Sequence, residues 1–145
     1  MSDTPHMVGH VHLKVRDLAT AVDFYAELLG LSVTERHDSY AFLSWGDRHH
    51  DVALQAVGPS ASDPPAAAVG LYHAAFEVDD PATLRRIHTA LEEAGHAVTA
   101  VDHGISKALY FDDPSGNGLE VYLDTRDEGE TTWQGRSTPF DPQAL

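Results

Sequence analysis

The feature that most constrains the fold is a repeat within the chain. The segment HVHLKVRD begins at His10 and the similar segment HAAFEVDD begins at His73, an offset of 73 − 10 = 63 residues. Each segment alternates apolar and polar residues, as a half-buried strand does, and then continues into a helical pattern. A chain that repeats such a unit is expected to fold as two similar modules. Its 145 residues are enough for two small modules to share a core.

Both predicted helices have recognisable ends. Asp17 and Asp80 are suitable N-cap residues, because a short carboxylate can accept a hydrogen bond from a free backbone N–H of the first turn. Gly30 and Gly95 stand where each helical pattern stops, as expected of a residue that adopts left-handed backbone angles easily. Between these ends run the apolar stripes Leu18, Val22, Tyr25 and Leu29 in the first helix and Leu84, Ile87 and Leu91 in the second.

Strand-like stretches follow each predicted helix. They span about residues 31–36, 40–45 and 50–57 in the first half and about 96–102, 106–112 and 118–124 in the second half. The sequence therefore predicts an α+β fold, βαβββ twice, with module bounds of 7–58 and 69–125. The stretch 58–68, GPSASDPPAAA, is expected to be the linker. Residues 126–145 form a polar C-terminal extension, expected to be loose or to pack on a partner, with Trp133 as the candidate anchor.

Composition excludes several classes of function. The chain has no cysteine, so disulfides and thiolate metal sites are excluded. Its formal charge of −14 would repel nucleic acids and anionic membranes, and neither is expected as a partner. No apolar run approaches the roughly 18 residues that a membrane helix needs, and the first residues lack the pattern of a signal peptide. The expected location is the cytoplasm.

Strand periodicity indicates which polar side chains share a face. His10 and His12 point to one side of the first strand, His73 to one side of the strand that opens the second module, and Glu120 to one side of the last strand. Two such polar faces curled together would form a cup-shaped mixed sheet. Two imidazoles and one carboxylate form a facial triad, which suits Fe(II) and also Mn, Co, Ni or Zn. The predicted ligands are His10, His73 and Glu120, with His12 as the alternative to His10.

Three sequence stretches resemble a known family. The stretch LYFDDPSGNGLEVY, residues 109–122, resembles the closing motif of the glyoxalase, bleomycin-resistance and extradiol-dioxygenase superfamily, also called the vicinal oxygen chelate superfamily. GHVHLKVRDL and LYHAAFEV resemble its two opening strands, so that the resemblance covers roughly residues 7–125. In that family the corresponding histidines and glutamate bind the metal, which implies the same role for His10, His73 and Glu120.

Two further motifs are similar to small catechol-2,3-dioxygenase-like proteins within this superfamily. RHHDVALQ, residues 48–55, resembles a segment with an active-site histidine, which would be His50. The spacing predicts that His50, Val52 and Leu54 share one face of a strand. Leu54 stands close to where related isomerases carry a fourth metal ligand, and an apolar residue there would leave three positions open for a catecholate and dioxygen. DHGISKALYF, residues 102–111, resembles the stretch whose histidine and tyrosine hydrogen-bond the substrate, here His103 and Tyr110.

The resemblance implies a metal-dependent enzyme that cleaves a catechol-type ring beside its two hydroxyl groups with dioxygen. Fe(II) is the expected metal, with Mn(II) or another divalent ion as the alternative, and a homodimer is expected. Phe42, Trp45 and Phe76 are expected in the pocket wall. The alternatives are an oxygen-independent enzyme, such as a glyoxalase-like isomerase or an epimerase, and a protein that sequesters a drug or metabolite. His6, His37, His88 and His96 are expected at the surface.

Overall fold

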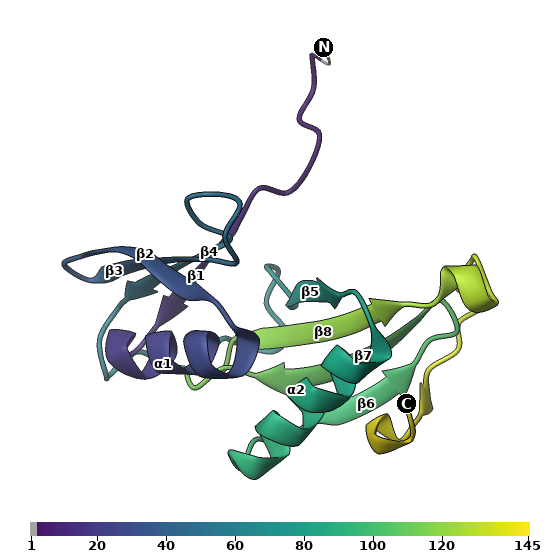
Figure 1. The fold of residues 1–145 in the computed structure, drawn as a ribbon. Helices are drawn as coiled ribbons and strands as arrows, with labels where there is room; N and C mark the ends of the chain where they lie inside the picture. Colours follow the sequence, from purple (N-terminus) through teal and green to yellow (C-terminus); the bar gives the residue numbers. More distant parts are fainter. Residues whose placement is uncertain (1–2) are drawn as a thin grey trace. The chain divides into compact units, whose positions relative to one another are not determined.

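The computed structural model describes residues 3–145. The chain divides into two compact units, Met1–Asp63 and Pro64–Leu145, and we describe each unit by itself (Figure 1). The division falls inside the stretch 58–68, where the structure has neither helix nor strand. The module bounds 7–58 and 69–125 stay a prediction.

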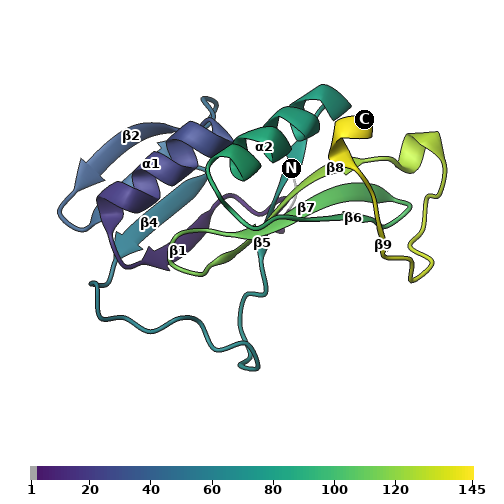
Figure 2. The same ribbon diagram turned by 90° about the horizontal axis from the view of Figure 1, so that it is seen from below.

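The first unit is a mixed sheet with one helix on its face. Its elements are β1 (Val11–Val15), α1 (Leu18–Leu29), β2 (Ser32–His37), β3 (Tyr40–Ser44) and β4 (Val52–Ala56). The strand order is β1-β4-β3-β2, with β1 parallel to β4 and the other pairs antiparallel. Helix α1 lies along one face of this sheet (Figure 2).

The second unit repeats this topology. Its elements are β5 (Ala74–Val78), α2 (Pro81–Glu93), β6 (Thr99–Asp102), β7 (Ser106–Asp112) and β8 (Gly118–Asp124), followed by η1 (Arg126–Glu128), β9 (Thr138–Pro139) and η2 (Pro142–Ala144). The order is β5-β8-β7-β6-β9, with β5 parallel to β8. The predicted α+β fold with βαβββ twice is therefore confirmed, as two mixed sheets each with a helix.

The helices begin and end as the sequence predicts. The Asp17 carboxylate accepts a hydrogen bond from the Thr20 backbone N–H at 2.8 Å, and Asp80 accepts one from Thr83 at 2.7 Å. Gly30 follows α1 with φ +74°, the left-handed conformation that glycine adopts with little strain. These caps set where β1 and β5 give way to their helices.

One helical histidine departs from expectation. His88 was expected at the surface, but it is 8% exposed and lies on the side of α2 where Leu84 and Leu91 are buried. The Gln143 side-chain amide donates to its Nδ1 at 3.0 Å, and its Nε2 lies 3.5 Å from a Glu92 oxygen. Burial is tolerated because both ring nitrogens have polar partners.

The C-terminal extension is also better anchored than expected. Strand β9 pairs with β6, and the following residues lie against α2 (Figure 2). Arg85 donates to the carbonyl oxygen of Leu145 at 2.5 Å, and the Gln143 amide also donates to Thr89 Oγ1 at 3.0 Å. Trp133, the expected anchor, is 59% exposed. The extension is therefore part of the second unit, held by strand pairing and by these hydrogen bonds.

Leu91→Ala is expected to destabilise the fold, because Leu91 is fully buried on α2. Removing a buried leucine side chain costs about 2–5 kcal/mol, the lost burial plus the cavity. Chemical denaturation followed by circular dichroism measures this change. Glu93→Ala is the matched control on the exposed side of the same turn. An unfolding midpoint for Leu91→Ala equal to that of Glu93→Ala would contradict this packing.

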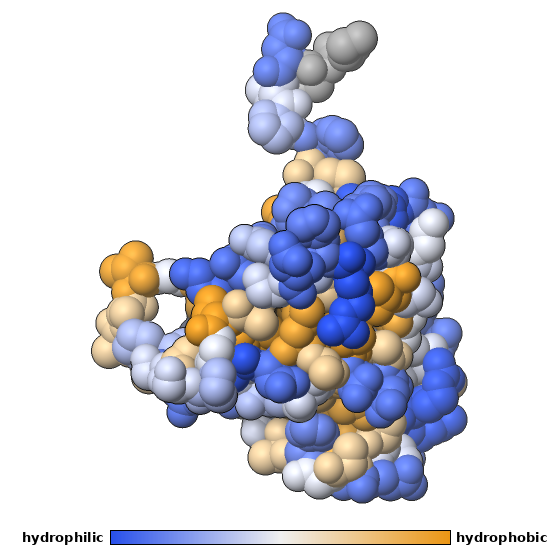
Figure 3. Space-filling view, turned by 90° about the vertical axis from the view of Figure 1, so that its left-hand side faces the viewer, coloured by the Kyte–Doolittle hydropathy of each residue, from blue (hydrophilic) through white to orange (hydrophobic). Residues whose placement is uncertain are grey.

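The surface carries several exposed large apolar side chains. Near the linker they are Val57, Val69, Leu71 and Tyr72. On the face drawn in Figure 3, apolar surface is interrupted by polar side chains. Among the described residues, none of the helices is both long and apolar enough to cross a membrane.

Candidate metal and substrate site

Strand register brings three of the predicted site residues to one face of the second sheet. Glu120 on β8 lies beside Ala75 of β5 on one side and Tyr110 of β7 on the other. His73 immediately precedes β5 and is two residues before Ala75, so it shares the face of Glu120. Glu120 is 8% exposed, although it lies on the polar face. A carboxylate so enclosed needs polar partners.

The partner of one Glu120 oxygen is His73. The His73 Nε2 atom lies 2.9 Å from Glu120 Oε2. Two ligands about 2.1 Å from one ion and at right angles to each other would be about 3 Å apart. The two donor atoms therefore fit neighbouring positions around a divalent metal, and a nitrogen and an oxygen donor suit Fe(II) or Mn(II).

The other Glu120 oxygen faces Tyr110. The Tyr110 hydroxyl donates to Glu120 Oε1 at 3.2 Å, and His103 Nε2 lies 2.8 Å from the same hydroxyl oxygen. Burial, followed by the negative charge of Glu120 and the hydrogen bond to it, raises the pKa of Tyr110 to about 12. The phenol therefore stays protonated at neutral pH and remains a hydrogen-bond donor. His73, Glu120, Tyr110 and His103 form one continuous polar row.

An open pocket of about 470 Å³ lies in the second unit beside this row. Its lining includes Tyr72, His73, Thr99 and Tyr110. Tyr72 was not expected in the site. Its ring centroid lies 5.2 Å from that of His73, and its adjacency to His73 in the sequence was the available signal.

Gly118 is a second contributor that the sequence reasoning missed. A Cβ atom at this position would lie 2.7 Å from the Tyr72 carbonyl oxygen and 3.5 Å from the His73 Cβ. Glycine thus lets the start of β8 approach the backbone that carries His73. The preceding turn is built by Asp113, whose Oδ1 accepts the backbone N–H groups of Ser115 and Asn117 at 2.8 and 3.0 Å. This turn leads directly into the strand that carries Glu120.

A second group of predicted residues gathers in the first unit. The ring centroids of His10 and His50 are 4.3 Å apart, and those of Phe42 and His50 are 5.1 Å apart. His49 Nδ1 lies 2.9 Å from His50 Nδ1. Burial, then the nearby His10 and His49, lowers the pKa of His50. The structure thus places His50 beside the predicted ligand His10 and the predicted pocket residue Phe42.

The interpretation of Leu54 requires a correction. Leu54 pairs with Leu13 and Ala41, and all three are buried on the apolar face. The residues of β4 on the polar face are Ala53, which pairs with His12 and Phe42, and Gln55, which pairs with Lys14 and Tyr40. His50 and Leu54 were expected on one face, but β4 begins only at Val52. His50 lies in the loop before it, where side chains do not follow the alternation of the strand. The three open metal positions expected from an apolar Leu54 stay a prediction, because Leu54 lies on the opposite face.

Two residues predicted for the pocket wall, Trp45 and Phe76, have other surroundings within their own units. The Trp45 indole N–H donates to the Leu29 carbonyl oxygen at 2.8 Å, so it caps the end of α1. Phe76 pairs with Val121, on the sheet face opposite to that of Glu120. It therefore does not lie beside the polar row.

Of the three predicted metal ligands, the second unit contains two, His73 and Glu120, and they lie next to each other. His10, and its alternative His12, belong to the first unit. Among residues 3–145, the structure gathers no group of three or more histidine, aspartate or glutamate side chains at a spacing that would hold one ion. The complete triad stays a prediction.

Comparison with known proteins agrees with this arrangement of motifs. Residues 7–121 match the model of the Glyoxalase/Bleomycin resistance protein/Dioxygenase superfamily. The chain belongs to this superfamily. The matched range includes both opening strands and the part of β8 that carries Glu120, so the family resemblance seen in the sequence is confirmed.

Curated relatives of this superfamily member include ring-cleaving dioxygenases. A catechol-2,3-dioxygenase of Bacillus subtilis is 35% identical over 88% of this chain, and a biphenyl-2,3-diol 1,2-dioxygenase of Rhodococcus globerulus is 32% identical over 86%. The matched regions span 44% and 66% of those two proteins. A glutathione transferase FosA of Serratia marcescens is 32% identical over 80% of this chain.

Solved structures of this superfamily share the fold. A glyoxylase/bleomycin resistance protein/dioxygenase domain from Frankia sp. EAN1pec has a TM-score of 0.71 and 26% identity, covering 83% of this chain and 99% of that one. A lactoylglutathione lyase from Agrobacterium tumefaciens has a TM-score of 0.63 and 25% identity, covering 82% of this chain and 94% of that one. The names of these relatives thus include dioxygenases, a glutathione transferase and a lactoylglutathione lyase.

Proposed function

We propose that this protein cleaves the ring of a catechol-type substrate beside its hydroxyl groups, using dioxygen and a divalent metal. The observation that carries this proposal is the polar row in the second unit. Tyr110 and His103 present hydrogen-bonding groups next to the paired donors His73 and Glu120. The similarity to two ring-cleaving dioxygenases supports it.

The metal would be held by His73 and Glu120, with His10 as the third ligand and His12 as its alternative. When bound, it supplies a Lewis acid for the two adjacent oxygens of a catechol and a place for dioxygen. Fe(II) is the metal we propose first. Mn(II) is the alternative, because another relative carries the name of a manganese-dependent 2,3-dihydroxybiphenyl 1,2-dioxygenase, from Geobacillus genomosp. 3.

The protein's own residues would orient the substrate and move its protons. Tyr110 is held protonated, and its O–H, which bonds Glu120 Oε1 in this structure, would turn to a substrate oxygen when the substrate binds. His103, bonded to the Tyr110 oxygen, fixes the direction of that hydroxyl. We propose His50 as the acid/base group, because a half-buried imidazole can accept and return a proton near neutral pH. Phe42 would form an apolar wall beside it.

Three further properties belong to this proposal. The active form would be a homodimer, the commonest symmetric assembly of soluble proteins. Its location would be the cytoplasm, which rests on the sequence alone. The modules would span 7–58 and 69–125, with 126–145 as an extension.

Oxygen uptake is the experiment that tests the function. After anaerobic loading with Fe(II), the protein is expected to consume one dioxygen per catechol, 3-methylcatechol or 2,3-dihydroxybiphenyl cleaved, with a new absorption band in the near-visible range. Both atoms of the dioxygen enter the product. The ring bond that breaks joins one hydroxylated carbon to its neighbour without a hydroxyl group. An oxygen electrode and a spectrophotometer measure the two signals together.

Resorcinol is the matched control, because its hydroxyl groups are not adjacent and cannot bind one metal through both oxygens. Metal bound without oxygen uptake from any catechol would contradict ring cleavage and favour an oxygen-independent isomerase or epimerase, or a transferase such as the FosA relative. A chain that retains no metal after loading would favour a binding protein.

A further inference from the structure

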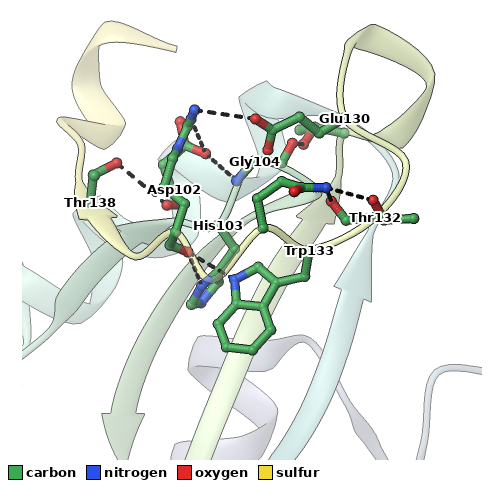
Figure 4. Close-up of polar contacts among 10 residues, drawn as sticks. Asp102, His103, Gly104, Glu130, Thr132, Trp133 and Thr138 are labelled. Carbon is green, nitrogen blue, oxygen red and sulfur yellow. Dashed lines mark hydrogen bonds and ion pairs between the residues drawn. The ribbon is translucent and has the colours of Figure 1, made fainter.

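The turn that carries His103 is covered by a segment outside the repeated βαβββ unit. We call residues 130–138 the tail strap. Its end enters β9, which pairs with β6 at Asp102 and Thr138, directly before His103 (Figure 4). Trp133 lies edge-on to the His103 ring, with centroids 6.4 Å apart and planes at 80°. The strap therefore forms one wall of the His103 environment.

The two nitrogens of the His103 ring face different partners. Nε2 faces the Tyr110 hydroxyl of the site at 2.8 Å. Nδ1 faces the strap, with the Ser137 hydroxyl and the Arg136 carbonyl oxygen each at 3.2 Å. The ring thus connects the strap to the polar row, and the position of its proton decides which way the hydrogen bonds run.

The Glu120 carboxylate determines the direction of the first of these bonds. A carboxylate only accepts, so the single Tyr110 hydroxyl proton is used in the bond to Glu120 Oε1. The Tyr110 oxygen can then only accept from His103, which requires a proton on Nε2. In a singly protonated imidazole, Nδ1 is consequently an acceptor.

Only one of the two strap groups can donate a hydrogen bond to an unprotonated Nδ1. The Arg136 carbonyl has no proton to give, and it already accepts the Trp133 indole N–H at 2.9 Å. The Ser137 hydroxyl can donate. The consistent arrangement runs from the Ser137 hydroxyl to His103 Nδ1, from His103 Nε2 to the Tyr110 oxygen, and from Tyr110 to Glu120.

We propose that Ser137 is a positioning residue that selects the Nε2-protonated tautomer of His103 and so keeps an N–H donor directed into the site. This inference rests on the proposed function for its effect on turnover, but the tautomer itself is a property of the hydrogen bonds. Without the Ser137 hydroxyl, the Arg136 carbonyl becomes the remaining strap partner and favours a proton on Nδ1. Nε2 would then accept from Tyr110 and compete with Glu120 for the phenol proton.

Several contacts hold the strap in place. Arg136 pairs with Asp102 at 3.1 Å and with Glu130 at 3.8 Å, and the Thr138 hydroxyl donates to the Asp102 carbonyl oxygen at 3.4 Å (Figure 4). Since the Arg136 side chain is 44% exposed, its ion pairs contribute little, and the β6–β9 pairing matters more. Gly104 has φ +83°, a backbone conformation that glycine adopts with little strain, and the Glu130 carboxylate lies against the place where a Cβ would stand.

The test compares Ser137→Ala with Ser137→Thr in the full-length chain before metal loading. Nitrogen-15 chemical shifts of the His103 ring, assigned with His103→Gln, report which nitrogen carries the proton. We expect the Nε2-protonated form in the unmodified protein and in Ser137→Thr, and a shift toward the Nδ1-protonated form in Ser137→Ala. Thr132→Ala is the matched control, because it removes a strap hydroxyl that bonds Gln134 instead of His103.

After Fe(II) loading, Ser137→Ala is expected to lower kcat about 3- to 10-fold with a smaller change in KM, the size of one lost hydrogen bond, and Ser137→Thr should restore it. An unchanged tautomer in Ser137→Ala would overturn the inference, whatever the activity. A changed tautomer in a protein that cleaves no catechol would support the role of Ser137 and contradict the proposed function. The two failures are therefore distinguishable.

Discussion

Replacing Glu120 or His73 by alanine is expected to remove the metal from the protein and with it all measurable ring cleavage. The two side chains approach to 2.9 Å on one sheet face, and each would supply one of three protein ligands. Loss of a group that merely supports a ligand already costs about 10- to 100-fold in metal affinity, so loss of a ligand should cost more than about 100-fold. Metal analysis after loading and dialysis, together with oxygen uptake, measures both effects.

Glu77→Ala is the matched control for these two variants. Glu77 lies on the same face of β5 but accepts a hydrogen bond from Tyr122 at 2.8 Å, and its loss should leave metal retention unchanged. In the first unit, His10→Ala and His12→Ala distinguish the two candidates for the third ligand, because only the true ligand should be required. Full metal retention by Glu120→Ala would show that the ligand assignment is wrong.

His50→Ala is expected to retain the metal and to lose turnover by about 10²- to 10⁴-fold, the usual contribution of a general acid/base group. His50 lies near His10 and Phe42, at centroid distances of 4.3 and 5.1 Å. Removing its ring leaves the proposed ligands intact and removes the group proposed to move protons. Steady-state oxygen uptake and metal content, measured on the same preparation, separate chemistry from binding.

His37→Ala is the control for this variant, since His37 is an exposed imidazole on β2 of the same unit. It should retain both metal and turnover. Turnover in His50→Ala that matches the unmodified protein would show that His50 is a structural or surface residue and that the acid/base assignment is wrong.

Much of the site in the second unit could be predicted, because its residues lie in or next to regular strands. Glu120 and Tyr110 keep the alternation of β8 and β7, and antiparallel pairing then brings them opposite each other. His73 adjoins the strand parallel to β8. The prediction that Leu54 shares a face with His50 was wrong, because His50 lies in the loop before β4. The alternation of side chains within a strand does not extend into a loop.

Other features depend on contacts between distant parts of the chain. His88 has a helical position beside the apolar stripe, but its burial depends on Gln143, 55 residues away. The strap residues Arg136 and Ser137 lie in a polar stretch without periodicity, and their contact with His103 follows from the pairing of β9 with β6.

The sequence by itself determined the repeated βαβββ pattern, the helix ends at Asp17, Asp80 and Gly30, and the membership of the superfamily. These depend on local backbone preferences and on alternation within single elements, which neighbouring residues carry. Only the tertiary structure decided that Glu120 divides its two oxygens between His73 and Tyr110, and that the C-terminal strap closes around His103. Such contacts depend on strand register and on the meeting of segments far apart in the chain, and no local pattern of residues encodes them.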